Sequence, residues 1–150
     1  MSTRIIDLND NNTGALIAPE WLPRAEAVHR QLRPDLAPNY AGTMGRVFAG
    51  GGRMSVAVVD DVVAGVAVFR VYVNTADGRH MYVDDLVTDE TRRSSGVGKA
   101  LLDHLQKRAV EQGCKSFKLD SGCQRQQAHK FYFREGLVVC AFHFRKMLSG

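Results

Sequence analysis

The amino-acid sequence predicts an α/β (α+β layered) domain in which helices flank a mixed central β-sheet. The order of the elements is the first observation, because a set of strands is followed by helix, strand, helix and strand. The second is the run Val62–Val73, which is apolar at nearly every position through Val68, as in a central strand covered on both faces. The third is the length of 150 residues, which fits one domain, 1–150, with a sizeable core.

The N-terminal half supplies an edge strand, two helices and a hairpin. Residues 4–8 are expected to form the edge strand. An amphipathic helix follows at 19–33, and its apolar face is made of Trp21, Ala25, Val28 and Leu32. A second short helix is expected near 40–48. The β-branched runs at 54–59 and 62–73 are joined by Asp60-Asp61, which predicts a tight hairpin.

The C-terminal half alternates strands and helices. A strand at 80–88 leads through a short polar link into a helix at 98–112, which Gly113 ends. The remaining expected elements are a strand at 115–121, a helix at 124–135 and a final strand at 137–147.

Composition narrows the class of protein. The net charge of +4 is modest and no basic stripe is present, so no nucleic-acid partner is expected. No apolar run approaches the ~20 residues of a membrane span, and the N-terminus lacks the apolar core of a signal peptide. The three cysteines lack metal-ligand spacing, which argues against a zinc site or a disulfide framework and favours a reducing cytoplasm.

The strongest local signal is the turn Arg93-Ser94-Ser95-Gly96-Val97-Gly98, which connects a strand to a helix. Unpaired backbone N–H groups at a helix start converge on one spot and, with the helix dipole, bind anions. Arg92, Arg93 and Lys99 add positive charge around it. The glycine and hydroxyl positions of a P-loop are not matched, and the dinucleotide fingerprint lacks its third glycine.

Two motifs in this half resemble those of one family. The turn matches Gln/Arg-x-x-Gly-x-Gly/Ala, which resembles the acetyl-CoA pyrophosphate loop of the GNAT superfamily of N-acetyltransferases. The stretch Ala128–Leu137 resembles the A-x-x-F-Y-x-x-x-G-F motif of the same family. Both occur in the right order with the right elements between them, and the resemblance covers roughly 50–147.

The resemblance implies the GNAT fold, with a splay between the strands at 80–88 and 115–121 where acetyl-CoA enters. Its pyrophosphate would contact the turn, which comprises Arg92, Arg93, Ser94, Ser95, Gly96, Val97, Gly98 and Lys99. Its pantetheine arm would pair with the backbone of the strand, and a backbone N–H there would polarise the acetyl carbonyl; these residues are Leu86, Val87 and Thr88.

Three side chains are candidates for catalysis. Tyr132 lies where the family often uses tyrosine to protonate the leaving thiolate, and a phenol titrating near ~10 can donate at neutral pH. Asp84, in preference to Asp85, is the candidate to accept the proton of the amine, and either carboxylate could instead hold a bulge or bind a cationic substrate. Strand alternation puts Asp84 on the face of Tyr82 and Leu86, but a bulge would swap the faces. Arg125 stands where many members carry an asparagine that contacts the cofactor, and it could meet a CoA phosphate instead.

The sequence therefore predicts a cytoplasmic, metal-independent N-acetyltransferase that uses acetyl-CoA and a primary amine on a small molecule. Two alternatives stay open: an acetyltransferase acting on a protein lysine or N-terminus, and a silent CoA-binding sensor. The family is often dimeric, and the apolar end around Phe142 and Phe144 could pair with a second copy or pack internally.

Overall fold

The structure is a computed structural model that describes residues 2–149. The chain divides into two compact units, 1–119 and 120–150. The first unit holds the whole β-sheet and three α-helices, and the second holds α4 (Gln126–Arg134). Along the described residues, no helix has both the length and the apolar character needed to cross a lipid bilayer.

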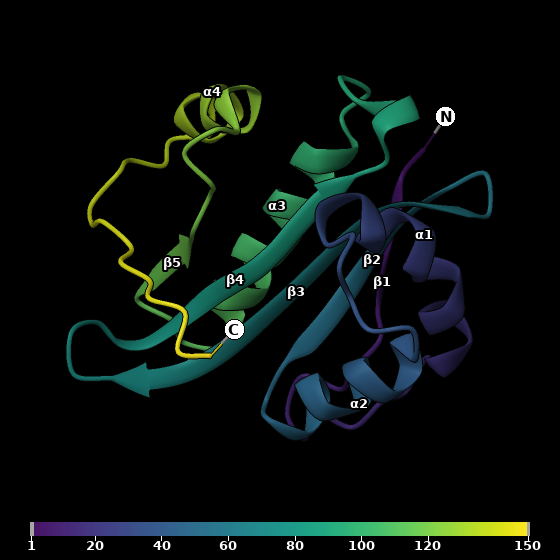
Figure 1. Ribbon diagram of the computed structural model, residues 1–150, viewed down its shortest axis with the longest axis horizontal. Helices are drawn as coiled ribbons and strands as arrows, with labels where there is room; N and C mark the ends of the chain where they lie inside the picture. The colour runs from purple at the N-terminus through teal and green to yellow at the C-terminus, as the bar shows by residue number, and fades with distance from the viewer. Residues whose placement is uncertain (1, 150) are drawn as a thin grey trace. The chain divides into compact units, whose positions relative to one another are not determined.

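The first unit is built on a five-stranded sheet with the order β1-β2-β3-β4-β5 (Figure 1). Neighbouring strands from β1 to β4 are antiparallel, and β5 runs parallel to β4, so the sheet is mixed as the sequence predicted. The strands are β1 (Arg4–Asp7), β2 (Arg53–Val59), β3 (Val62–Asn74), β4 (Gly78–Thr88) and β5 (Ser116–Leu119).

Helices cover both faces of this sheet. The helices α1 (Leu22–Leu32) and α2 (Tyr40–Ala49) lie on one face and α3 (Val97–Glu111) lies on the other (Figure 1). Alternation along β3 shows why both faces are apolar: Val66 and Val68 belong to the core on the α1 side, whereas Ala67 and Phe69 belong to the core on the α3 side. Two short 3₁₀ helices, η1 (Pro19–Trp21) and η2 (Glu90–Arg92), precede α1 and α3.

The hairpin expected at Asp60-Asp61 is present. Both residues are left-handed, with φ of 51° and 63°, and Val59 pairs with Val62 across the turn. Two left-handed residues give the turn the twist of the strands it joins. The other elements expected before residue 136 also form, and their ends differ from the expected ones by a few residues.

The expected final strand at 137–147 is wrong, because residues 137–149 form neither strand nor helix. A strand needs a hydrogen-bonded neighbour, and among the described residues no strand pairs with this segment. Its apolar side chains are exposed, with Phe142 at 83% and Phe144 at 91%, so they are not packed internally as one alternative had it. The sequence of this segment fits a strand, but it carries no information about whether a partner strand is present.

A polar cluster centred on Asp7 joins β1 to α3. One carboxylate oxygen of Asp7 accepts hydrogen bonds from Ser55 Oγ at 2.6 Å and His104 Nε2 at 2.9 Å, and the other accepts from Arg108 Nη1 at 2.5 Å. Burial by itself would raise the pKa of Asp7, but the hydrogen bonds from His104 and Ser55 and the charges of His104 and Arg108 outweigh burial and lower it.

Replacing Asp7 with Asn should lower the free energy of unfolding near neutral pH by about 1–3 kcal/mol, because the partners lose a charged acceptor. Since the pKa of Asp7 is lower in the folded state than its unfolded value near ~3.9, this stabilisation is complete above that value. It is lost as the pH falls through the folded pKa. Urea unfolding of both proteins at decreasing pH should therefore show a gap that closes on acidification.

Asp61→Asn is the matched control, because Asp61 is 76% exposed and its ion pairs with Arg4 and Arg24 are long, at 3.5 and 3.7 Å. Exposed pairs of this kind contribute little, so its unfolding free energy should stay near that of the wild type. A gap for Asp7→Asn that stays constant down to pH ~3 would contradict the assignment of the stabilisation to the charge of Asp7.

Candidate active site

The loop between β4 and α3 is held on the first unit by contacts to β3 and α1. Asp89 donates its backbone N–H to Ala64 O at 2.8 Å, and its side chain accepts from the N–H of Thr91 at 3.2 Å, which caps η2. Gln31 of α1 accepts from the N–H of Glu90 at 2.9 Å. These hydrogen bonds to β3 and α1 fix the position of the turn at 93–98 that follows.

The turn itself opens α3 with exposed backbone donors. Ser94 and Gly96 are left-handed, with φ of 64° and 87°, and Gly96 is the N-cap residue. The first helical hydrogen bond runs from Ala100 N–H to Gly96 O at 3.0 Å, so the N–H groups of 97–99 precede the intrahelical ladder. No side chain caps this end, and a Cβ on Gly96 would meet no protein atom within 4 Å. This is the geometry of an anion site with an open approach.

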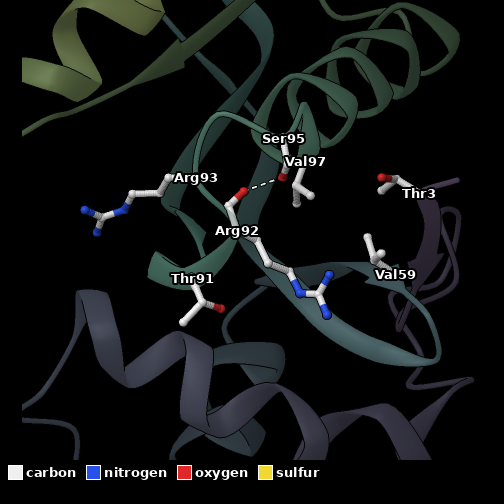
Figure 2. Close-up of a pocket in the computed structure, with 7 residues that line it drawn as sticks. All are labelled: Thr3, Val59, Thr91, Arg92, Arg93, Ser95 and Val97. Carbon is white, nitrogen blue, oxygen red and sulfur yellow. Dashed lines mark hydrogen bonds between the residues drawn. The ribbon is translucent and has the colours of Figure 1, made fainter. Parts of the chain in front are cut away.

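A cavity of about 320 Å³ adjoins this turn, and Figure 2 shows its lining from the residue before β1, from β2, from η2, and from the turn and first residue of α3. The lining residues are Thr3, Val59, Thr91, Arg92, Arg93, Ser95 and Val97. The side chains of Arg92 and Arg93 leave the loop in different directions, and Ser95 Oγ donates to the Arg92 carbonyl (Figure 2). Lys99, which was expected to join this positive ring, forms a 3.3 Å ion pair with Asp103.

Next to the turn, β4 loses its neighbour on one side. Residues Leu86, Val87 and Thr88 pair with β3. On the other side β5 pairs only with His80–Val83, so no strand of the described chain pairs with 84–88 along that edge. This is the expected splay, and it leaves a strand edge to which an extended ligand could add.

Gly65 brings α3 close to this edge. A Cβ at Gly65 would lie 3.1 Å from Val97 Cγ1 and 3.3 Å from Val87 O, so a larger residue would require the first residue of α3 or the backbone of β4 to move slightly away from β3. Val87 is buried on the α1 side and Leu86 packs on the α3 side. The side chains of these two residues thus belong to the core, while their backbone forms the open edge.

A β-bulge in β4 decides which way the two acidic side chains face. Val68 pairs with Asp85 and Phe69 with Val83, so Asp84 is an extra residue without a partner on β3. Asp84 contacts Arg70, which shares the α1 side with Val68 by alternation. Asp85 contacts α1, so both carboxylates lie on the α1 side. Asp84 thus keeps the face of Tyr82, as alternation predicted, and the bulge moves Leu86 to the opposite face.

Each carboxylate is already paired with basic groups. Arg70 donates Nε and Nη2 to the two oxygens of Asp84, at 2.8 Å each. Asp85 accepts from His29 Nε2 at 2.7 Å and from Arg33 Nε and Nη2 at 2.8 and 2.6 Å. Burial would raise the pKa of Asp85, but the hydrogen bonds from His29 and Arg33 outweigh it and hold the pKa below its ordinary value.

Sequence reasoning missed the groups that surround these carboxylates. His29 is 2% exposed and its second nitrogen, Nδ1, lies 2.7 Å from the hydroxyl of Tyr40 on α2. A signal was available, because His29 lies four residues after Ala25, on the apolar stripe of the expected helix. The stripe indicates burial, but it does not indicate that Asp85 and Tyr40 are the partners.

Tyr132 and Arg125 lie together in the second unit. Tyr132 is a buried residue of α4, and Arg125, just before the helix, hydrogen-bonds its side chain. Burial raises the pKa of the Tyr132 phenol, and the charge and hydrogen bond of Arg125 oppose this only in part. The phenol therefore keeps its proton at neutral pH. The contact of Arg125 with Tyr132 was not foreseen, since Arg125 was considered only as a partner for CoA.

Two curated bacterial proteins are similar to part of this chain. The "Uncharacterized N-acetyltransferase YhdJ" of Bacillus subtilis is 41% identical over 70 residues, which are 46% of this chain and 49% of that protein. The "Aminoalkylphosphonate N-acetyltransferase" of Salmonella typhimurium is 32% identical over 66 residues, 44% of this chain and 43% of that protein. The matched stretches thus span less than half the length of these relatives.

Structural similarity extends over nearly the whole chain. A structure of AAC(6')-Iy with a bisubstrate analogue, CoA-S-monomethyl-acetylneamine, matches with a TM-score of 0.78 at 18% identity, covering 98% of this chain and 100% of that one. At this identity the match supports the fold alone. The model of the acetyltransferase (GNAT) family matches residues 17–136, which is most of the sequence. The chain therefore belongs to the acetyltransferase (GNAT) family.

Proposed function

We propose that this protein transfers the acetyl group of acetyl-CoA to a primary amine of a small molecule, by direct attack within a ternary complex. The observation that carries the proposal is the uncapped start of α3 beside the unpaired edge of β4, with Arg92 and Arg93 at the same turn. An anion site and an open strand edge, side by side in one unit, fit a long ligand that has a pyrophosphate and an amide-containing arm.

Each part of acetyl-CoA has a proposed partner among the residues of this region. The backbone of 93–99 would hold the pyrophosphate, with Arg92 and Arg93 as phosphate partners. The edge formed by Leu86, Val87 and Thr88 would pair with the pantetheine amides, and one of its N–H groups would polarise the acetyl carbonyl. When bound, acetyl-CoA supplies an activated acetyl group.

The two carboxylates of the bulge are suited to the amine. Asp84 and Asp85 face the same side of the sheet, adjacent to the Leu86–Thr88 edge. Asp84 is the more exposed, at 35% against 13%, and we assign to it the role of proton acceptor as the nitrogen forms its new bond. Asp85, which is held by three donors, is assigned to binding the amine.

Tyr132 is the proposed proton donor to the departing thiolate. Its raised pKa supports this role, because a donor must still carry its proton at the pH of the reaction.

The proposal of a small-molecule acceptor rests on the proteins that this chain is similar to. One relative is named for aminoalkylphosphonates, and the bound analogue in a structural neighbour contains acetylneamine. We place the reaction in the cytoplasm, where the three cysteines, which are free in the structure, would remain reduced.

A thiol-release assay with acetyl-CoA tests this function across aminoalkylphosphonates, aminoglycosides, polyamines and lysine peptides. Release that depends on a small amine, with the acetylated product identified by mass spectrometry, is the expected result. Release with peptides only would move the function to a protein acetyltransferase. CoA binding without release for any amine would indicate a CoA sensor.

Replacing Gly96 with Val should weaken CoA binding by at least about tenfold, because the new side chain would cover the backbone donors at the start of α3. Titration calorimetry with CoA measures the effect. Gly113→Val is the matched control: Gly113 is also left-handed, with φ of 76°, and has no protein atom within 4 Å of its Cβ position, but it follows the other end of α3. Equal CoA affinity of the two folded variants would refute the assignment of the turn.

Replacing Tyr132 with Phe should lower kcat by about 10²-fold, near the low end of the range for a general acid, because a thiolate leaves fairly well unaided. The ring is kept, so CoA affinity should stay near that of the wild type. The raised pKa predicts that this dependence on Tyr132 persists through neutral pH and is lost only above pH ~10, where the phenol ionises. Equal kcat values, with chemistry rate-limiting, would show that Tyr132 is only a core residue.

A further inference from the structure

A buried chain of hydrogen bonds runs from Tyr40 through His29 to Asp85, and the roles assigned above use only Asp85. We propose that His29 positions the Asp85 carboxylate to bind the acceptor amine, and that protonation of His29 weakens this binding. The inference rests on the proposed acetyltransferase function and deepens it, because it names the residue that sets the pH range in which the acceptor is bound.

A neutral His29 ring can satisfy both hydrogen bonds of this chain. The ionised Asp85 can only accept, so we assign the Nε2 proton of His29 to the 2.7 Å contact with Asp85. Tyr40 remains a phenol, since burial and the nearby charges of Glu26 and Asp85 raise its pKa. Its hydroxyl can then donate to Nδ1 at 2.7 Å, so both nitrogens of a neutral ring are satisfied, whereas a protonated ring would donate to the Tyr40 oxygen instead.

The hydrogen-bond capacity of Asp85 leaves one place for a ligand. A carboxylate offers about four acceptor sites, two on each oxygen. Arg33 fills both sites on Oδ1 with Nε and Nη2, and His29 fills one on Oδ2. The remaining site is on Oδ2, the atom that His29 holds, and Asp85 keeps 13% of its side-chain surface exposed. An amine N–H bound to Asp85 would therefore share its acceptor atom with His29.

The charges around this site are balanced while His29 is neutral. Asp85 is offset by Arg33 and Asp84 by Arg70. On α1, Glu26 is offset by Arg30, whose guanidinium also lies over the Tyr40 ring. Protonation of His29 would add one uncompensated positive charge 2.7 Å from Oδ2, which disfavours a cationic acceptor at the same atom.

Two substitutions separate positioning from simple packing. His29→Gln keeps an N–H donor near the place of Nε2 but cannot become charged, and His29→Leu removes the donor. The measurement is the ratio of kcat/KM for the variant to that of the wild type, with one amine, between about pH 5.5 and 8.5. The ionisation of the amine cancels in this ratio, so any remaining pH dependence belongs to the protein.

His29→Leu should raise the acceptor KM about tenfold at the upper end of this range, with CoA affinity unchanged. His29→Gln should stay within about threefold of the wild type there, and its ratio should rise as the pH falls, because only the wild type acquires the charge. His104→Gln is the matched control: His104 also donates to a carboxylate, that of Asp7, but outside the site. Its ratio should not change with pH.

A ratio for His29→Gln that is flat with pH would overturn the proposal, and so would equal losses in the Gln and Leu variants. If His29→Leu fails to fold, as judged by urea unfolding, the pH dependence of the kcat/KM ratio for His29→Gln tests the proposal by itself. The outcome is distinguishable from failure of the proposed function: a wild-type protein that releases no thiol with any amine would refute both, whereas an active wild type with a flat ratio would refute only the role of His29.

Discussion

The arrangement of the candidate site depends on one extra residue in a strand. The bulge at Asp84 shifts the alternation of β4, so that Asp84 and Asp85 both lie on the α1 side while Leu86 stays in the core on the α3 side. Without the bulge, strict alternation would send adjacent carboxylates to opposite faces. The bulge also comes directly after Val83, the last residue of β4 that pairs with β5. The same short segment thus redirects the acidic side chains and begins the open edge.

Two partly buried carboxylates side by side require compensation, which explains the basic groups around them. Bringing charges out of water is costly unless they are paired and hydrogen-bonded. Arg70 donates two hydrogen bonds to the carboxylate of Asp84. Arg33 donates to the carboxylate of Asp85 and also to the backbone carbonyl of Asp84, at 3.1 Å. Arg33 therefore satisfies both a carboxylate and a backbone group of the bulge. The basic groups that pair with the two carboxylates come from the neighbouring strand β3 and from the end of α1.

Much of this could be predicted from local sequence. Glycine at positions 96 and 98 before an apolar helical stripe predicts an open helix start, and Asp60-Asp61 between β-branched runs predicts a hairpin. Long-range pairing could not be predicted in the same way. The partners of Asp85 are 52 and 56 residues away in the chain, and nothing in their spacing links them. The strand expected at 137–147 was wrong for the same reason, since a strand needs a hydrogen-bonded neighbour and the local sequence does not show whether one is present.

The helix α1 connects the parts of the candidate site within the first unit. Gln31 contacts both Asp89 and Glu90 in the loop that carries the anion-binding turn, whereas His29 and the C-cap residue Arg33 contact Asp85 next to the bulge. Residues two apart on a helix point in different directions, so one turn of α1 can reach two separate segments. The loop after β4 and the bulge within β4 are consequently held by the same rigid element. A displacement of α1 would move both together, and the amphipathic stripe of α1 on the sheet is what prevents it.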